Sequence, residues 1–128
     1  MSAQKIVIQF AIGLLSLGAM VGSHAQTPHS RLDSVLAIKK VRVCIWPDYY
    51  GITYRNPKTQ RLSGVDADLA LELGKDLGVA VEFVDTNFAS LINDLGANKC
   101  DVAMFSVGIT AQRLDKLRFT KPTLVSDI

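Results

Sequence analysis

The sequence has 128 residues, enough for about one globular domain, and its 48% hydrophobic and 20% charged residues are ordinary for such a domain. Its 14 basic and 12 acidic side chains nearly cancel, and no stretch concentrates five or six like charges. This charge balance argues against nucleic acid or an anionic membrane as the partner of the protein.

The chain begins with the features of a cleavable signal peptide. A long apolar run at 6–21 follows Lys5, and Ser23 and Ala25 after it are the small residues that signal peptidase reads. Because the run is slightly short for a full membrane span, cleavage after Ala25 is favoured over an uncut membrane anchor. The sequence therefore predicts a signal peptide at 1–25 and an exported mature chain at 26–128.

Helices and strands alternate along the rest of the chain. Ser30 can cap a first helix, β-branched residues before Pro47 indicate a strand, and Asn87 is placed to cap a later helix. The expected elements are, in chain order, a helix at 30–40, a strand at 41–46, an irregular hairpin within 47–64, a helix at 65–78, a strand at 79–84, a helix over 88–95 and a strand at 101–107.

The helix at 65–78 has the clearest signals. Asp66 and Asp68 fall in its first turn, where carboxylates stabilise the positive end of the helix dipole, and we interpret them as structural rather than catalytic. Gly78 is expected to end the helix. The face toward the core is predicted from apolar residues four apart, which are Val65, Leu69, Leu73 and Leu77.

This order of elements predicts an α/β layer structure with parallel strands and right-handed crossovers. In open α/β sheets, ligands bind beyond the carboxyl ends of the strands. Three loops are expected to meet at that edge, and they carry aromatic, polar and small residues at 46–49, 85–88 and 106–108.

The two cysteines leave one question open. In an oxidising compartment Cys44 and Cys100 could form a disulfide, because their strands are expected to be neighbours. Cys44 lies well along its strand and Cys100 begins the other, and this stagger could exceed the roughly 7 Å between Cα atoms that a bridge allows. A metal site would need more ligands, since His29 lies in the polar N-terminal lead, so neither a metal nor another cofactor is predicted.

Arg113 follows the last expected strand after Thr110, which lies near the start of a short helix. A guanidinium at this edge of the sheet can bind a carboxylate through two parallel hydrogen bonds. The alternative is a surface arginine that pairs with Asp115 or Asp94, an arrangement that contributes little.

Four segments together resemble the amino-terminal lobe of the bacterial family 3 extracellular solute-binding proteins, the periplasmic receptors of polar amino-acid ABC transporters. They are VRVCIWPDYYGITYR, LSGVDADLALELGKDLG, DTNFASLINDLGANKCDVAMF and GITAQRLDKLRFTKP. The resemblance covers about 40–128 and implies a periplasmic-binding-protein-like lobe with a mostly parallel sheet flanked by helices. The second lobe is missing from this sequence, which implies a fragment or a truncated form that binds ligand weakly by itself.

The resemblance also implies ligand-binding residues. Tyr49 and Phe88 match aromatic residues that pack on the two sides of the ligand, Ser106 matches a contact to the amino acid, and Arg113 matches the arginine that binds the α-carboxylate. Two further positions depart from the family and are expected to alter the pocket. Gly108 stands where a hydroxyl side chain usually assists the arginine, and Trp46 stands where a small or acidic residue is common.

Each of these residues has a structural alternative. Tyr49 and its neighbour Tyr50 could be loop aromatics packed on the hairpin, and Phe88 could be a plain core residue of its helix. Ser106 could be an ordinary hydroxyl at a strand end.

The function implied by the resemblance is a periplasmic binding component without enzymatic activity. It would hand a small carboxylate-bearing solute, such as a polar amino acid, to an ABC permease in the inner membrane. Periplasmic cyclohexadienyl dehydratases resemble the same scaffold, and for that chemistry the chain offers Asp48 or Asp85 as an acid but no nearby histidine. A third reading is a solute-binding domain of a sensor or accessory protein.

Overall fold

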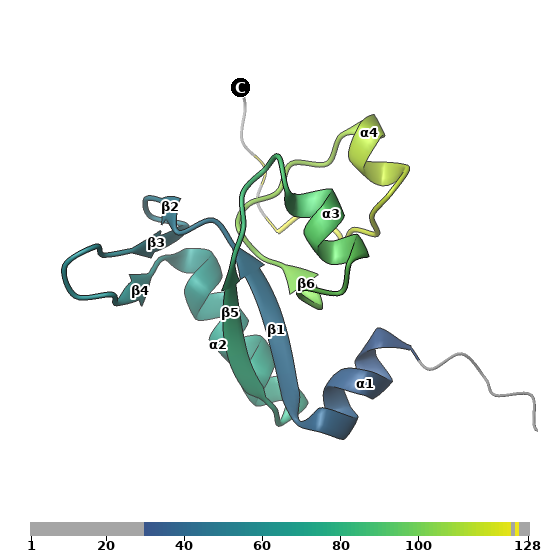
Figure 1. The fold of residues 1–128 in the computed structure, drawn as a ribbon, viewed down its shortest axis with the longest axis horizontal. Coiled ribbons are helices and arrows are strands. Elements are labelled where there is room, and N and C mark those ends of the chain that lie inside the picture. The colour runs from purple at the N-terminus through teal and green to yellow at the C-terminus, as the bar shows by residue number, and fades with distance from the viewer. Residues whose placement is uncertain (1–29, 124, 126–128) are drawn as a thin grey trace, which may run out of the picture.

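The computed structural model describes residues 30–123 and 125, so the expected signal peptide at 1–25 lies outside the described residues. No helix within these bounds is long and apolar enough to cross a membrane. Figure 1 shows the elements in chain order: α1 (Arg31–Ile38), β1 (Lys40–Ile45), β2 (Asp48–Tyr49), β3 (Thr53–Arg55), β4 (Leu62–Ser63), α2 (Val65–Leu77), β5 (Ala80–Asp85), α3 (Leu91–Gly96), β6 (Val102–Ala103) and α4 (Ala111–Leu114).

The main sheet has the strand order β5-β1-β6, and both neighbours run parallel to β1. This confirms the predicted α/β arrangement, in which a helix separates each pair of parallel strands. The expected hairpin region forms a separate small sheet of β2, β3 and β4 with antiparallel pairing. The two sheets meet where the chain leaves the carboxyl end of β1 (Figure 1).

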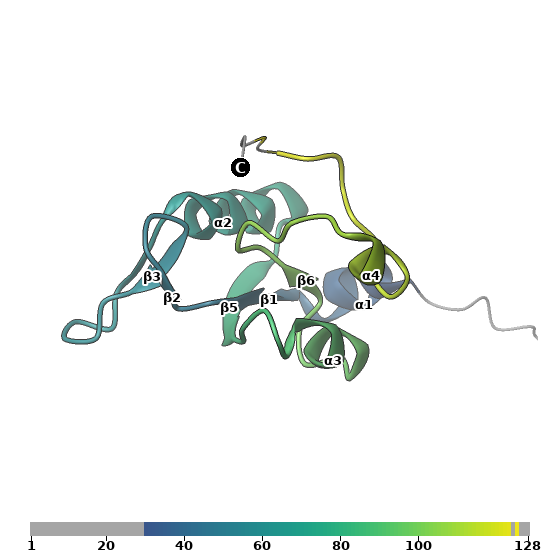
Figure 2. The ribbon, with the colours of Figure 1, turned by 90° about the horizontal axis from the view of Figure 1, so that it is seen from above.

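Helices cover both faces of the main sheet. Viewed from above, α2 lies on one face and α3 on the other, with the strands between them (Figure 2). The core under α2 is built on the central strand β1, and its buried residues are Val35, Val41, Val43, Ile45 and Ala70. The partly buried Leu62, Leu77, Val79, Val81, Phe83, Val102 and Met104 pack around it.

The predicted apolar face of α2 is wrong in its first half, whereas Leu73 and Leu77 are partly buried and Leu77 packs against the core. Val65 and Leu69 are 43% and 42% exposed, and the face that is buried instead carries Ala67, Ala70 and Gly74. The reason is the close approach of α2 to β5, because a side chain at Gly74 would collide with the side chain of Val81. Small residues, rather than the large ones of the leucine stripe, determine which side of this helix meets the sheet.

The predicted start of α1 and the predicted end of α2 are confirmed by their backbone geometry and hydrogen bonds. The Ser30 hydroxyl accepts from the Asp33 amide at 3.1 Å and the Asp33 carboxylate accepts from the Ser30 amide at 3.0 Å, which is a capping box. Gly78 ends α2 with φ at +64°. The expected cap at Asn87 is displaced, because α3 begins at Leu91 with Ser90 at its N-cap. The Asn87 side chain instead holds the preceding turn, where it accepts from the main-chain amides two and three residues further on, both at 2.9 Å.

The last strand is much shorter than the predicted 101–107. Only Val102–Ala103 pair as β6, and the Met104 amide makes the final bond to the sheet, at 3.0 Å from the Cys44 carbonyl. The chain then turns away from the sheet, and Ser106 adopts a left-handed backbone conformation with φ at +51°. The apolar residues up to position 107 therefore do not indicate a strand of that length, because Phe105 is buried without belonging to a strand.

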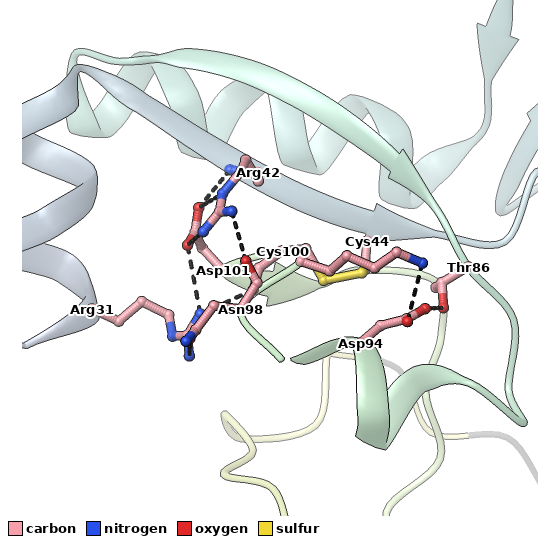
Figure 3. The surroundings of a disulfide bond; sticks show 9 residues. Arg31, Arg42, Cys44, Thr86, Asp94, Asn98, Cys100 and Asp101 are labelled. Atoms are coloured by element: carbon pink, nitrogen blue, oxygen red, sulfur yellow. Dashed lines mark hydrogen bonds and ion pairs between the residues drawn. A yellow bond between two sulfur atoms is a disulfide. The ribbon is translucent and has the colours of Figure 1, made fainter. Parts of the chain in front are cut away.

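Cys44 and Cys100 form a disulfide, which settles the question left open by the sequence. Their Cα atoms lie 5.6 Å apart and both side chains are fully buried. The stagger does not prevent the bond, because Cys100 precedes β6 and the chain bends between them. Figure 3 shows the disulfide crossing between β1 and the segment that leads into β6.

An ion-pair network lies beside the disulfide (Figure 3). Asp101, whose side chain is 7% exposed, accepts hydrogen bonds from the Arg42 amide at 2.8 Å and from the Arg42 Nη2 at 2.7 Å. Arg31 Nη1 lies 3.6 Å from the same carboxylate and donates to the Cys100 carbonyl at 3.0 Å. The network therefore ties α1 to the chain on both sides of the disulfide.

This network predicts an acid-sensitive contribution to stability. Burial opposes ionisation of Asp101, but the hydrogen bonds and the charge of Arg42, with the charge of Arg31, outweigh it and lower the pKa of the carboxyl. A lowered folded-state pKa adds stability above the unfolded-state pKa, and this stability is lost as the pH falls through the folded-state pKa, below about pH 4.

We expect Asp101→Asn to lower the free energy of unfolding by about 1–3 kcal/mol at neutral pH, because Arg42 loses its charged acceptor. The variant should also flatten the decline in stability below about pH 4. Urea unfolding across this pH range is the measurement, with the exposed Asp76→Asn as the control. A decline in Asp101→Asn as steep as in the wild type would contradict the assignment.

Candidate functional site

The candidate site lies at the carboxyl ends of the three parallel strands, where the topology predicted it. Trp46 and Tyr49 follow β1, and Phe88 lies between β5 and α3. Ser106 and Gly108 follow β6, and Arg113 belongs to α4.

Four rings form an aromatic cluster at this edge: Trp46, Tyr49, Phe88 and Phe105. The centroid of the Phe88 ring lies 5.3 Å from that of Trp46, 6.0 Å from that of Tyr49 and 5.0 Å from that of Phe105. Phe105 is fully buried, whereas the other three rings are only half-buried. The cluster is therefore a platform with a buried base and a partly open surface.

The structure separates the two adjacent tyrosines. Tyr49 packs on Trp46 with ring centroids 5.3 Å apart, so it belongs to the aromatic cluster. Tyr50 is 83% exposed and packs on Tyr54 of the small sheet. The alternative of a loop aromatic on the hairpin thus describes Tyr50, whereas Tyr49 lies in β2 and packs in the aromatic cluster, and its role toward a ligand stays a prediction.

Arg113 lies against this platform. Its guanidinium carbon is 5.4 Å from the centroid of the Phe88 ring, within the range of a cation–π contact. Its Nη1 donates to the Gly108 carbonyl at 2.8 Å. Among residues 30–123 and 125, no carboxylate forms an ion pair with Arg113, and Asp94 pairs with Lys99 instead. The guanidinium is held in place while donors remain for another partner.

Gly108 supplies its carbonyl to the arginine rather than a side chain. A Cβ atom at this position would lie 3.7 Å from Arg113 Nη1, which is an ordinary contact. The nearby hydroxyl of Thr110 caps α4 by accepting from the Arg113 amide at 3.3 Å. Both interactions orient the arginine, but the carbonyl oxygen of Gly108 cannot donate a hydrogen bond as a hydroxyl side chain would.

Ser106 has a partner that sequence reasoning missed. Its amide donates to Oδ2 of Asp66 at 2.5 Å and its hydroxyl donates to the same atom at 3.2 Å. The hydroxyl proton is thus occupied, and the oxygen keeps lone pairs that can accept from a ligand. Asp66 was interpreted only as a carboxylate of the first turn of α2, and no signal in the sequence links positions 40 residues apart.

Further bonds fix the loops that carry the aromatic cluster. The buried Thr53 donates from its hydroxyl to the Trp46 carbonyl at 2.8 Å, which ties the small sheet to the end of β1. Arg55 and Asp85 form an ion pair at 2.8 Å across the same edge. Both acids considered from the sequence, Asp85 and Asp48, are exposed, and Asp85 is paired with Arg55.

Thr86 and Asp94 support the turn that presents Phe88. The Thr86 hydroxyl donates to Asp94 at 2.5 Å and Lys99 Nζ lies 3.1 Å from the same carboxyl group (Figure 3). The hydrogen bond from Thr86, and then that from Lys99, hold the pKa of Asp94 below its usual value. In the described part of the chain, no three His, Cys, Asp or Glu side chains gather as a candidate metal site.

Comparison with known proteins identifies the family. Residues 41–128 match the sequence profile of the bacterial extracellular solute-binding proteins, family 3. The chain belongs to this family. The resemblance stated from the sequence is thereby confirmed, and so is a fold of the periplasmic-binding-protein type.

Among curated family 3 relatives, the histidine-binding periplasmic protein of Escherichia coli K12 is 33% identical over 124 residues, which are 97% of this chain and 43% of the relative. Cyclohexadienyl dehydratase of Pseudomonas aeruginosa is 30% identical over 111 residues, 87% of this chain and 41% of the relative. The chain thus spans less than half the length of these relatives.

Solved structures give the same picture. An ancestral cyclohexadienyl dehydratase superposes with a TM-score of 0.72 and 40% identity, over 79% of this chain and 42% of that one. A variant of the arginine-bound form of domain 1 from TmArgBP has a TM-score of 0.68 and 27% identity, over 73% of this chain and 71% of that one. The described fold therefore corresponds to one lobe of such proteins.

Proposed function

We propose that this chain is the ligand-capturing lobe of a periplasmic solute-binding protein that takes up a small carboxylate-bearing solute, such as a polar amino acid. The observation that carries the proposal is Arg113, a guanidinium fixed against Phe88 and the Gly108 carbonyl, with no carboxylate partner among the described residues. A free arginine at the ligand edge of an α/β sheet suits a carboxylate, which it can bind through two parallel hydrogen bonds.

The aromatic cluster supplies the rest of the binding surface. Phe88 lies beside the guanidinium, and Trp46 and Tyr49 pack on Phe88. These three half-buried rings offer apolar and π contacts to the body of the ligand. Ser106 offers a hydroxyl oxygen as an acceptor for a ligand N–H group. A carboxylate next to an ammonium group, as in a free amino acid, fits this pairing of donor and acceptor.

The names of the relatives support the class of ligand and the setting. The matching curated proteins include histidine-binding and L-cystine-binding proteins, and the matching structures include arginine-bound ones. The proposed setting is the periplasm, reached through the signal peptide at 1–25, and the proposed partner is an ABC permease of the inner membrane.

The test is calorimetric titration of the purified protein with a panel of polar amino acids. We expect Arg113→Ala to weaken binding by about 10- to 100-fold, which corresponds to the free energy that a hydrogen bond to a charged group contributes. Arg113→Lys should recover only part of the loss, because an ammonium lacks the two-pronged geometry. The exposed Arg118→Ala is the control for charge alone. Equal affinity of Arg113→Ala and wild type would contradict the role of Arg113.

A second candidate is a dehydratase of the cyclohexadienyl type, favoured by the 40% identity to the ancestral dehydratase. That activity needs an acid at the site. Asp85 is engaged with Arg55, which leaves the exposed Asp48 as the candidate. Turnover of prephenate or arogenate that is lost in Asp48→Asn would establish the enzyme and replace the binding role.

A further inference from the structure

Residues 106–113, here called the arginine segment, have few ties to the rest of the fold although they carry Arg113. The last main-chain bond to the sheet is made before the segment, by the Met104 amide. Within the described residues, the main-chain bonds of the segment itself are local and run from the amides of residues 113–117 to the carbonyls of Thr110, Ala111 and Arg113. Side chains must therefore set the direction in which the segment leaves the sheet.

The segment begins with an unfavourable backbone conformation. Ser106 has φ at +51°, in the left-handed region that residues with a Cβ atom rarely adopt. Such a conformation persists where surrounding interactions hold it. Because the segment continues from this turn, the conformation of Ser106 sets the direction in which the chain runs toward Arg113, whose side chain then contacts Phe88 and the Gly108 carbonyl.

Asp66 is the group that holds it. The residue is 6% exposed, and one oxygen of its carboxylate receives both donors of Ser106, the amide at 2.5 Å and the hydroxyl at 3.2 Å. Among the described residues no basic side chain forms an ion pair with Asp66. The first turn of a 13-residue helix stabilises its negative charge, so the lone pairs remain directed to Ser106.

We propose that Asp66 is a positioning residue of the ligand site: its carboxylate holds Ser106 in the left-handed conformation and thereby fixes the arginine segment. The inference rests on the proposed function, since it concerns the site at which Arg113 would bind a carboxylate. It assigns to Asp66 a role that its neighbour in the same turn does not share, because Asp68 is exposed.

The first experiment compares three variants by calorimetry with the polar amino acid that binds the wild type best. We expect Asp66→Ala to weaken binding by about tenfold, as the loss of a charged hydrogen-bond acceptor would. Asp66→Asn keeps an oxygen in place and should recover part of the affinity. Asp68→Ala removes the same charge from the same helix turn and should stay within about twofold of the wild type. Equal losses in Asp66→Ala and Asp68→Ala would overturn the proposal.

A second experiment separates positioning from general stability. Glycine adopts positive φ without strain, so residue 106 needs less support in a Ser106→Gly background. We expect Asp66→Ala to cost clearly less affinity in that background than in the wild type, as measured by a double-mutant cycle. The same cost in both backgrounds would overturn the proposal, and thermal unfolding of each variant identifies any that fail to fold.

A third measurement works without ligand. In ¹⁵N NMR spectra we expect Asp66→Ala to shift the Ser106 amide proton upfield and to move the Arg113 Nε–H signal, which lies near the Phe88 ring. An unchanged Arg113 signal would overturn the positioning role. If the wild type binds no polar amino acid, the proposed function fails, and the Arg113 signal alone still decides the present inference.

Discussion

Removal of the disulfide between Cys44 and Cys100 is expected to lower the free energy of unfolding by about 4 kcal/mol. The reason is that the cross-link closes a long loop and so reduces the conformational entropy of the unfolded chain. Cys44 and Cys100 are 56 residues apart in sequence. A cross-link between distant positions restricts the unfolded chain, and both cysteines are fully buried in the folded one. The cost is large for a domain of this size, whose total stability is about 5–15 kcal/mol.

The measurement is urea unfolding of the wild type and of a Cys44→Ala/Cys100→Ala double variant, each with and without a reductant. We expect the reductant to destabilise the wild type and to leave the double variant unchanged. The ion pair of Arg42 with Asp101 should persist in the variant, since it is formed by side chains and main chain beside the sulfur atoms. Equal unfolding midpoints of oxidised wild type and double variant would contradict a stabilising role.

The second large effect is expected at Phe105. Replacement by alanine should cost about 3–5 kcal/mol of unfolding free energy, the usual range for a buried phenylalanine. The Phe105 side chain is fully buried, with 0% of its surface accessible to solvent. Its ring lies 5.0 Å from that of Phe88, so its loss would also leave the aromatic cluster without its base.

Two readouts check this expectation. Urea unfolding gives the loss of stability, and titration with a polar amino acid under folding conditions gives the loss of affinity. Tyr50→Ala is the matched control, because this aromatic residue is 83% exposed and its removal should change stability by no more than about 0.5 kcal/mol. A Phe105→Ala variant as stable as Tyr50→Ala would refute the assignment of Phe105 as the base of the cluster.

The features that the sequence predicted are those with local signals. The alternation of helices and strands, the cap at Ser30 and the end of α2 at Gly78 each depend on residues within one or two turns. The edge of the sheet that carries Arg113 followed from topology, because parallel strands place their carboxyl ends together. The resemblance to the family added roles to these residues, and those roles remain predictions.

The features that the sequence did not predict depend on how distant parts pack. The leucine stripe of α2 was a poor guide, since the close contact of Gly74 with Val81 decides the buried face. The disulfide depended on a bend before β6 that no periodicity reveals. The bond from Ser106 to Asp66 joins two polar residues whose positions become neighbours only after α2 lies on the sheet.

The small residues of α2 have a consequence for how the candidate site keeps its shape. A helix is a stiff rod, and the contact at Gly74 lies eight residues, or about 12 Å, from the carboxylate of Asp66. The close packing of Gly74 on the sheet therefore helps to fix the position of the Asp66 carboxylate near the other end of α2. The contact of Gly74 with Val81 therefore contributes to the position of the candidate site, although neither residue belongs to it.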